Sequence, residues 1–354
     1  MSTAYRLFAS FGTVALFVVS GYALTAFVPS LARKAFARRL AWAYLLGLAY
    51  AGVTLYALSH WAGVGLRRGA ILSVLAVPIV LAAWRRPTLR REEGRRGAPL
   101  SSLQSRGERA ACAAAIAAGG LVSAAVLAHA VSSVESGYDP RMTWNASAAY
   151  VRAARSVDPP ALLDKSVYIQ NPRYPLLLPV LQVTGEEVFD TDDDERVSRP
   201  LYAVLLPVLL LLVFDVARPF AGTLAAALTV FAVAFLPGIV FDLDGGAITS
   251  YSDLPMGLLW GGGLVLVFRA PRRLPEALAG GLLLGGAALA KAEGLLLAAV
   301  VVAIASLRVA RRLIRRRRNS PWHPRIARAT GCTLAVFLFA AADRKSTRLN
   351  SSHG

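Results

Sequence analysis

Apolar and polar residues alternate along this 354-residue chain in long blocks, and the apolar blocks can cross a hydrocarbon core of about 30 Å. The apolar blocks lie at 8–29, 40–61, 69–84, 110–131, 201–216, 221–240, 254–268, 274–290, 295–307 and 329–342. One polar interruption, residues 133–199, is much longer than the others. This pattern predicts an all-α polytopic membrane protein with about ten transmembrane helices and a long exterior loop that carries short interfacial helices.

Basic residues are concentrated in every second major segment between the blocks. The chain has 39 Lys and Arg against 21 Asp and Glu, a net charge of +18. The basic segments are 33–39, 85–109, Arg218, 269–273 and 308–328; the acidic ones hold Asp139, 186–195, 242–253 and 291–293. Because Lys and Arg mark cytoplasmic loops, the acidic segments are expected to face the periplasm or cell exterior.

This distribution of charge argues against nucleic-acid binding, which needs a basic stripe on one folded surface. It predicts instead a multi-pass protein of the inner (plasma) membrane. Residues 1–84 are expected to form amino-terminal membrane helices, 85–109 a basic cytoplasmic loop, and 110–342 a second membrane domain. Residues 343–354 resemble the translation of a short-read sequencing adaptor, so we expect a non-native tail and a natural protein that continues beyond residue 342, truncated here at its carboxy-terminus.

The sequence contains no set of metal ligands with a recognisable spacing. Cys112 and Cys332 lie within apolar blocks, where small buried side chains are expected rather than a disulfide or zinc site. The acidic run 190–195 is expected to be a solvated loop, with attraction of a divalent cation as the alternative. No metal or cofactor is therefore required, and a role for a divalent cation is left open.

Asp139 is the candidate catalytic residue. It follows the apolar block 110–131 by a few residues, within Ser-Gly-Tyr-Asp-Pro. A carboxylate just outside the bilayer can act as a general base on a hydroxyl group that is presented from the aqueous side. The alternative is an ordinary aspartate that begins a turn before Pro140.

Arg173 and Tyr174 precede an apolar, proline-bounded run that suits a short helix in the membrane interface. Arg173 is able to bind a phosphate through two parallel hydrogen bonds. The alternative is that both side chains only anchor the chain at the lipid headgroups. Asp253 begins the block 254–268, where it either caps the helix or contacts substrate beside Asp139.

Lys291 and Glu293 separate the apolar blocks 274–290 and 295–307. Each limb has about seventeen residues, a helix of about 25 Å that barely spans the core. Ionisable residues at this depth are a functional hypothesis by default. The lysine would meet a lipid-linked phosphate, and the glutamate would orient it, bind a sugar hydroxyl or hold a metal. A broken helix with Gly294 as the hinge is expected; the alternative is that both side chains snorkel to the interface.

The chain resembles the membrane glycosyltransferases of the C superfamily, the group with protein mannosyltransferases and lipid A sugar transferases. The resemblance covers roughly residues 110–307 and rests on short motifs in the expected order. These are Tyr138-Asp139-Pro140 through Trp144-Asn145, then Asn171-Pro172-Arg173-Tyr174-Pro175-Leu176-Leu177-Leu178-Pro179, then Ser250-Tyr251-Ser252-Asp253-Leu254-Pro255, then Ala290-Lys291-Ala292-Glu293-Gly294-Leu295.

This resemblance implies the inverting transfer of a hexose or pentose from a polyprenyl-phosphate donor to an exterior glycan, lipid or protein acceptor, with Asp139 as the catalytic carboxylate. The substrate-binding candidates are Lys291, Glu293, Asp253, Arg173, Tyr174 and Asn145. The chain departs from the family pattern at Asn171, where a His is expected, near Arg173, where an acidic residue is expected, and near Ser147, where a basic one is expected. A transporter or flippase of a lipid-linked substrate is the alternative from another class, and an inert scaffold is a third.

The expected sidedness is tested by placing single cysteines at 139 and 291 in a background without Cys112 and Cys332. Both cysteines should react with a membrane-impermeant thiol reagent applied to intact cells, because both segments are assigned to the exterior. A cysteine at Arg218 should react only after permeabilisation. Labelling of 139 and 291 from opposite compartments would remove the shared exterior site.

Overall fold

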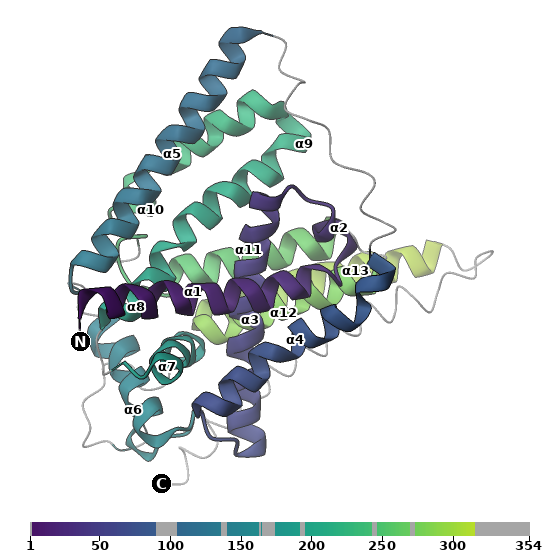
Figure 1. Cartoon of the computed structure of the whole chain (residues 1–354). Coiled ribbons are helices and arrows are strands. Elements are labelled where there is room, and N and C mark those ends of the chain that lie inside the picture. The colour runs from purple at the N-terminus through teal and green to yellow at the C-terminus, as the bar shows by residue number, and fades with distance from the viewer. Residues whose placement is uncertain are drawn as a thin grey trace.

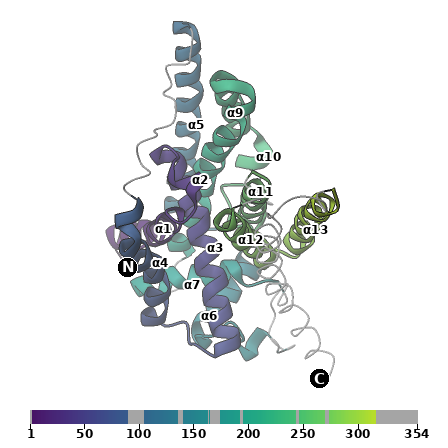
Figure 2. The ribbon, with the colours of Figure 1, turned by 90° about the vertical axis from the view of Figure 1, so that its right-hand side faces the viewer.

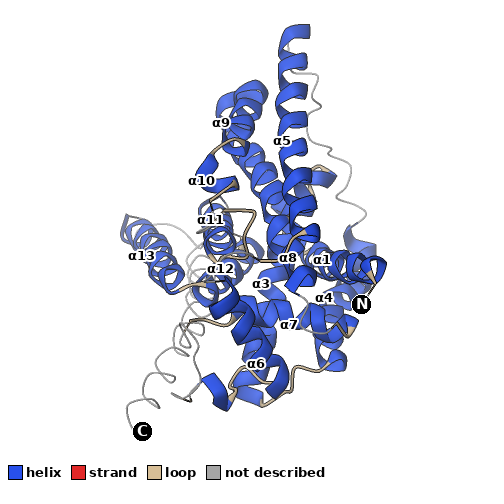
Figure 3. Cartoon of the chain, turned by 90° about the vertical axis from the view of Figure 1, so that its left-hand side faces the viewer, coloured by secondary structure: helices blue, strands red, loops and turns tan. Residues whose placement is uncertain are grey.

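The structure, a computed structural model, describes residues 2–89, 105–135, 140–162, 164, 174–191, 195–242, 246–269 and 273–315. Within these ranges it consists of helices and loops without strands (Figure 3). The helices are α1 Thr3–Thr25, α2 Pro29–Ala32, α3 Phe36–Ala62, α4 Arg68–Leu89, α5 Arg106–Ser132, the π-helical turn η2 Pro140–Asn145, α6 Ala146–Ala154, the 3-10 turn η3 Pro160–Leu162, α7 Leu177–Phe189, α8 Glu195–Ala203, α9 Leu205–Ala234, α10 Pro237–Val240, α11 Asp253–Arg269, α12 Leu274–Ala290 and α13 Ala292–Arg315. The predicted all-α class is confirmed for this part of the chain.

Five helical segments in the described ranges are long and apolar enough to cross a membrane. They are Thr3–Thr25, Phe36–Ala62, Arg68–Arg85, Arg106–Ser132 and Glu195–Ala234. Shorter apolar helices cover Asp253–Phe268 and Leu274–Ala290. These lengths support a helical membrane protein. The total of ten spans stays a prediction, and the block 329–342 lies outside the described residues.

α9 reverses direction at Gly222, where φ is 82° and ψ is 176°. This conformation is open to glycine at little steric cost. The two limbs both pack on α5, because a Cβ added to Gly119 would lie 3.2 Å from Leu210 and 3.5 Å from Val230. α5 and α9 together form an arm that projects from the other helices (Figures 1 and 2). The reversal lies next to the predicted boundary between the fifth and sixth apolar blocks.

α3 lies at the centre of the remaining helices. Its Trp42, Tyr44 and Leu45 are almost fully buried, and one hydrophobic core joins α3 to α1, α7, α9, α11 and α12. Helices from residues 1–84 and from 110–342 thus share this core. The predicted division into two separate membrane domains stays a prediction.

α1 and α3 cross at two glycines. A Cβ on Gly21 would overlap the carbonyl oxygen of Ala43, and a Cβ on Gly47 would overlap that of Phe17. Small residues at such a crossing let two helix backbones approach closely, which is the usual packing solution between membrane helices.

α7 begins at Leu177, close to the short helix expected after Tyr174, and its place in the membrane interface stays a prediction. Nearly every side chain from Leu177 to Val188 is buried in protein. A Cβ on Gly52 of α3 would collide with the Leu177 side chain, so the two helices are in close contact. The apolar run therefore predicts a helix, but it does not reveal that α3 covers it.

Charged side chains form one group near the start of α12. Lys34 and Arg38 both bind the Asp215 carboxylate of α9, and the Trp42 indole N–H donates to the same carboxylate at 3.2 Å. Glu276 of α12 accepts a hydrogen bond from the backbone N–H of Ser30 at 3.2 Å. These contacts join segments that the charge pattern assigns to the cytoplasmic side.

A second group of charged side chains lies at the other end of α12. Lys291 follows the last residue of that helix and pairs with Asp253. The rise of a 17-residue helix separates the two groups by about 25 Å. The Lys291–Asp253 pair therefore joins two segments that were predicted to share a side.

The α1–α3 crossing is tested by Gly47→Ala. The new methyl group would overlap the Phe17 carbonyl oxygen, so we expect destabilisation of about 1–3 kcal/mol, the usual range for overpacking. The measurement is the thermal unfolding midpoint of detergent-solubilised protein. Gly120→Ala in α5 is the matched control, because no atom lies within 4 Å of the added Cβ there. Equal midpoints for both variants would contradict the tight crossing.

Candidate functional site

Lys291 occupies a one-residue break between two helices. α12 ends at Ala290, α13 begins at Ala292, and Lys291 between them has extended backbone angles of φ −152° and ψ 156°. Its N–H still donates to the carbonyl oxygen of Ala287 at 3.3 Å. The break places a charged side chain between the end of one apolar helix and the start of the next.

The hinge was predicted at Gly294, and this position is wrong. Gly294 lies inside α13, one turn after the break, and its φ is not positive. A Cβ at this position would overlap the carbonyl oxygen of Ala287 in α12. Gly294 therefore allows the two helices to approach closely after the turn, while Lys291 itself makes the turn.

Lys291 forms an ion pair with Asp253, the first residue of α11. The Lys291 Nζ donates to Asp253 Oδ1 at 2.6 Å. The Asp253 side chain is 41% exposed and that of Lys291 is 20% exposed, so the pair lies at the surface of the helix bundle with the ammonium partly covered. The proximity of these two candidates, far apart in sequence, agrees with the predicted shared site.

The surroundings of Lys291 keep its side chain positively charged. Burial lowers the pKa of the ammonium, but the hydrogen bond and charge of Asp253 outweigh burial, so the pKa is raised above its ordinary value. Glu293 and the Tyr174 hydroxyl act in the same direction. Glu293 is exposed, and its charge acts on Lys291 from the first turn of α13. Three predicted substrate-binding residues thus surround the lysine.

Tyr174 is held by an aromatic contact. Its ring stacks on that of Trp144 with centroids 5.2 Å apart and an interplanar angle of 16°. Trp144 is buried in η2. Offset stacking of this kind adds roughly 0.5–1.5 kcal/mol beyond area burial. The contact connects η2, in the long polar segment, to Tyr174 and so to the surroundings of Lys291.

Asn145 was predicted to bind substrate, and both ends of its side-chain amide have protein partners. Its Nδ2 donates to Glu195 Oε2 at 3.3 Å, and its Oδ1 accepts from Gln182 Nε2 at 3.1 Å. Gln182 also donates to the Tyr202 hydroxyl at 2.8 Å. Asn145 therefore lies within a polar chain that links η2, α7 and α8.

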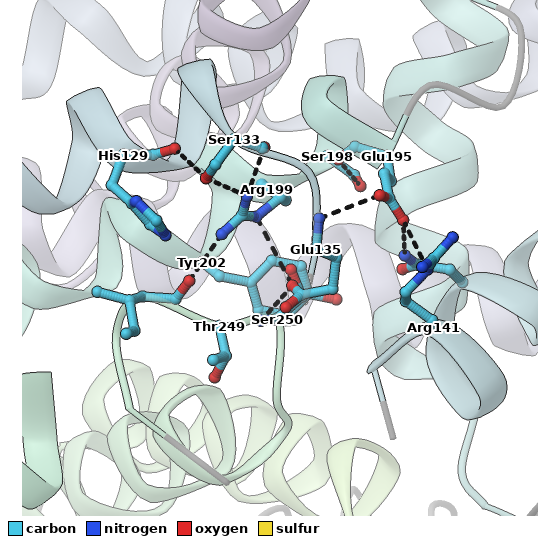
Figure 4. Close-up of polar contacts among 12 residues, drawn as sticks. His129, Ser133, Glu135, Arg141, Glu195, Ser198, Arg199, Tyr202, Thr249 and Ser250 are labelled. Atoms are coloured by element: carbon cyan, nitrogen blue, oxygen red, sulfur yellow. Dashed lines mark hydrogen bonds and ion pairs between the residues drawn. The ribbon is translucent and has the colours of Figure 1, made fainter. Parts of the chain in front are cut away.

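Glu195 contradicts the prediction that the acidic run 190–195 is solvated. Its Oε1 accepts from the N–H of Glu135 at 3.0 Å, and its Oε2 lies 3.7 Å from Arg141 Nε (Figure 4). Asp190, at the end of α7, is exposed as expected. The run is therefore mixed: one end is solvated and the other is built into the structure.

Glu135 and Arg199 form a buried ion pair that the sequence reasoning missed. Their side chains are 0% and 2% exposed, and Glu135 Oε2 lies 3.6 Å from Arg199 Nε. Arg199 also donates to the hydroxyl of Ser133 at 2.7 Å and to the carbonyl oxygen of Ile248 at 2.8 Å (Figure 4). The sequence signal that could have found this pair is one acidic and one basic residue, each next to an apolar block that flanks the long polar segment.

Several buried oxygens near this region have no hydrogen-bond partner among the described residues. They belong to Thr143, Gln182, Ser250 and Ser252. Buried polar groups are normally satisfied, so water or a polar ligand is the expected partner. In the described ranges, no three His, Cys, Asp or Glu side chains come together in a way that could hold a metal ion.

The predicted catalytic Asp139 and the predicted phosphate-binding Arg173 lie outside the described residues, as does Asn171. Their assigned roles therefore remain predictions. Comparisons of the chain with protein-family models, with curated proteins and with solved structures found no match. The described part of the candidate site is therefore the arrangement around Lys291.

The Lys291–Asp253 pair is tested through the reactivity of the lysine. Asp253→Asn removes the charge that raises the Lys291 pKa, so the neutral, reactive amine should appear at lower pH. We expect the midpoint of Lys291 acylation by a water-soluble succinimidyl ester, followed by peptide mass spectrometry, to shift to lower pH. Lys34, paired with Asp215 at the other end, is the internal control. An unchanged Lys291 profile would contradict the pair.

Proposed function

We propose that the protein is an integral membrane glycosyltransferase that moves a sugar from a polyprenyl-phosphate donor to an exterior acceptor with inversion. The observation that carries the proposal is the Lys291–Asp253 pair at a helix break, 2.6 Å apart and at the acidic end of α12. A fixed, partly covered cation at the edge of an apolar layer suits a phosphate whose lipid chain lies in the bilayer.

Lys291 acts on the leaving group in this proposal. As the bond between the anomeric carbon and the phosphate oxygen breaks, the electron pair stays on the polyprenyl phosphate. The ammonium, oriented by Asp253 in advance, stabilises this growing negative charge in a setting of low dielectric constant. Pre-orientation matters because a free lysine side chain would lose rotamer entropy at that step.

Asp139 activates the acceptor in the same proposal, on the basis of its place in the sequence and the family resemblance. Its carboxylate takes the proton of the acceptor hydroxyl while the hydroxyl oxygen bonds to the anomeric carbon. Glu293 and Tyr174, both next to Lys291, contact the sugar or its phosphate. Arg173 adds a second positive charge to the phosphate, and Asn145 supports the wall of the site.

A transporter or flippase of a lipid-linked substrate is the second candidate, and the broken helix at Lys291 favours it too. Transporters place binding sites at discontinuous helices near the middle of the membrane. The Lys291 break lies instead after the last turn of α12, at the end of a 17-residue helix that begins beside the other charged group. Chemistry at one membrane surface fits this position better.

The decisive measurement is sugar transfer in proteoliposomes that contain the full chain. Polyprenyl-phosphate-linked mannose, glucose and arabinose, labelled in the sugar, are offered together with envelope membranes as the acceptor. Lys291→Met should lower the transfer rate by about 10²-fold, the usual effect of removing one group that stabilises transition-state charge. Asp139→Asn should remove transfer, and Lys291→Arg should retain part of it.

Asp158→Asn is the control, since Asp158 is half exposed and its described side-chain partner is His60 rather than a residue of the candidate site. Wild-type protein that moves the labelled lipid between leaflets without forming a product would favour the transporter. Undiminished transfer by Asp139→Asn or Lys291→Met would remove that residue from the mechanism.

A further inference from the structure

Glu135 and Arg199 have no part in the mechanism above, yet they are among the least exposed charged residues of the described chain. A buried ion pair is costly unless its remaining hydrogen-bonding groups are also satisfied. Here they are satisfied mainly by the backbone and side chains of two separate segments, at 133–135 and 248–250. The pair therefore joins α8 to both segments at once.

The segment 248–250 leads directly into α11 and so into the candidate site. Glu135 Oε2 accepts from the backbone N–H of Ser250 at 3.0 Å, and Arg199 Nη2 donates to the carbonyl oxygen of Ile248 at 2.8 Å. Asp253 is the first residue of α11, three residues after Ser250. The two hydrogen bonds thus fix the point from which α11 starts.

The start of α11 decides whether Asp253 can reach Lys291. The helix continues without further breaks to Arg269, and its first turn is closed by a bond from the Met256 N–H to the Ser252 carbonyl oxygen at 2.9 Å. A shift of one residue would rotate the first residue of α11 by about 100° around the helix axis. The 2.6 Å contact with Lys291 would then be lost.

We propose that Glu135 and Arg199 are positioning residues, which hold the segment 248–250 so that Asp253 meets Lys291. The ion pair fixes the position of the residues before α11. This position determines where α11 begins and so where Asp253 lies relative to Lys291. Its bearing on sugar transfer rests on the proposed function, but its effect on the Asp253–Lys291 contact does not.

The experiment measures the pH profile of Lys291 acylation in the full chain. Glu135→Ala removes the acceptor for the Ser250 N–H, and Arg199→Lys cannot donate to two separate segments through a planar fork. Both variants should shift the Lys291 profile to lower pH, toward that of Asp253→Asn. Glu135→Gln keeps an oxygen that accepts from Ser250, so its profile should lie closer to that of the wild type.

The matched control is Arg152→Gln, which breaks an exterior ion pair between α6 and α7, 3.6 Å long, that does not touch the segment 248–250. Its Lys291 profile should equal that of the wild type. If Glu135→Ala does not fold, as judged by size exclusion in detergent, Arg199→Lys and Glu135→Gln carry the test. An unshifted profile in Arg199→Lys, beside a shifted one in Asp253→Asn, would overturn the positioning role.

Sugar transfer is measured on the same variants as a separate readout. If positioning matters for transfer, Arg199→Lys should lower kcat more than it raises KM, because the charge offered to the leaving phosphate is misplaced. Transfer that is absent in the wild type sinks the proposed function but leaves the acylation result valid. A fall in transfer without any shift of the Lys291 profile would contradict positioning through Asp253.

Discussion

The arrangement of the helices depends on where charged side chains can find partners. An apolar layer offers neither water nor free hydrogen-bonding groups, so an ion within it must be paired. In the described chain, ion pairs around Asp215 and Glu276 lie near the start of α12, and the Asp253–Lys291 pair lies at its end. The Glu135–Arg199 pair is connected to Asp253 through the segment 248–250. The hydrophobic core between them supplies burial, and the paired ends fix which helices are neighbours.

The two groups act on different parts of the fold. At the first end, Asp215 gathers Lys34, Arg38 and Trp42, which ties the arm formed by α5 and α9 to the start of α3. Arg199, in α8 just before the same arm, and Glu135 bind the segment that precedes α11. Networks in which every polar group has a hydrogen-bond partner rigidify a structure, because movement of one side chain would leave the others without a partner. The arm is thus anchored just before α9, through Arg199, and within the first limb of α9, through Asp215.

The helical class of the fold and part of the candidate site could be predicted from the sequence. The block 274–290 coincides with α12, because charges or a proline mark both its ends. The block 110–131 was four residues too short at its start, because the capping box of Ser105 and Glu108 lies in a polar segment that hydrophobicity does not register. Helix ends set by polar capping are therefore systematically missed by apolar pattern alone.

Tertiary contacts account for the errors in the site. Lys291 and Asp253 were found because charges beside apolar blocks stand out, and their predicted convergence needed only a shared side of the membrane. Glu135 and Arg199 also lie beside apolar blocks, but that signal does not identify which residue far along the chain is the partner of either one. The packing of α7 against α3 was not predicted for the same reason, since its apolar run does not reveal which surface covers it.

The break at Lys291 shows most clearly that local preference is overridden. Gly222 reverses α9 in a conformation that glycine adopts freely, so that turn is encoded by one residue. Ala290, Lys291, Ala292 and Glu293 are all good helix formers, and alone they would continue α12 into α13. The break must therefore be held from outside. The close approach of Gly294 to Ala287 keeps the two helices together after the turn, and Asp253 holds the lysine that the turn exposes. Positions where local and tertiary preferences disagree tend to be functional, because selection for stability alone would have removed the conflict. This conflict is the strongest physical reason to propose a functional role for Lys291.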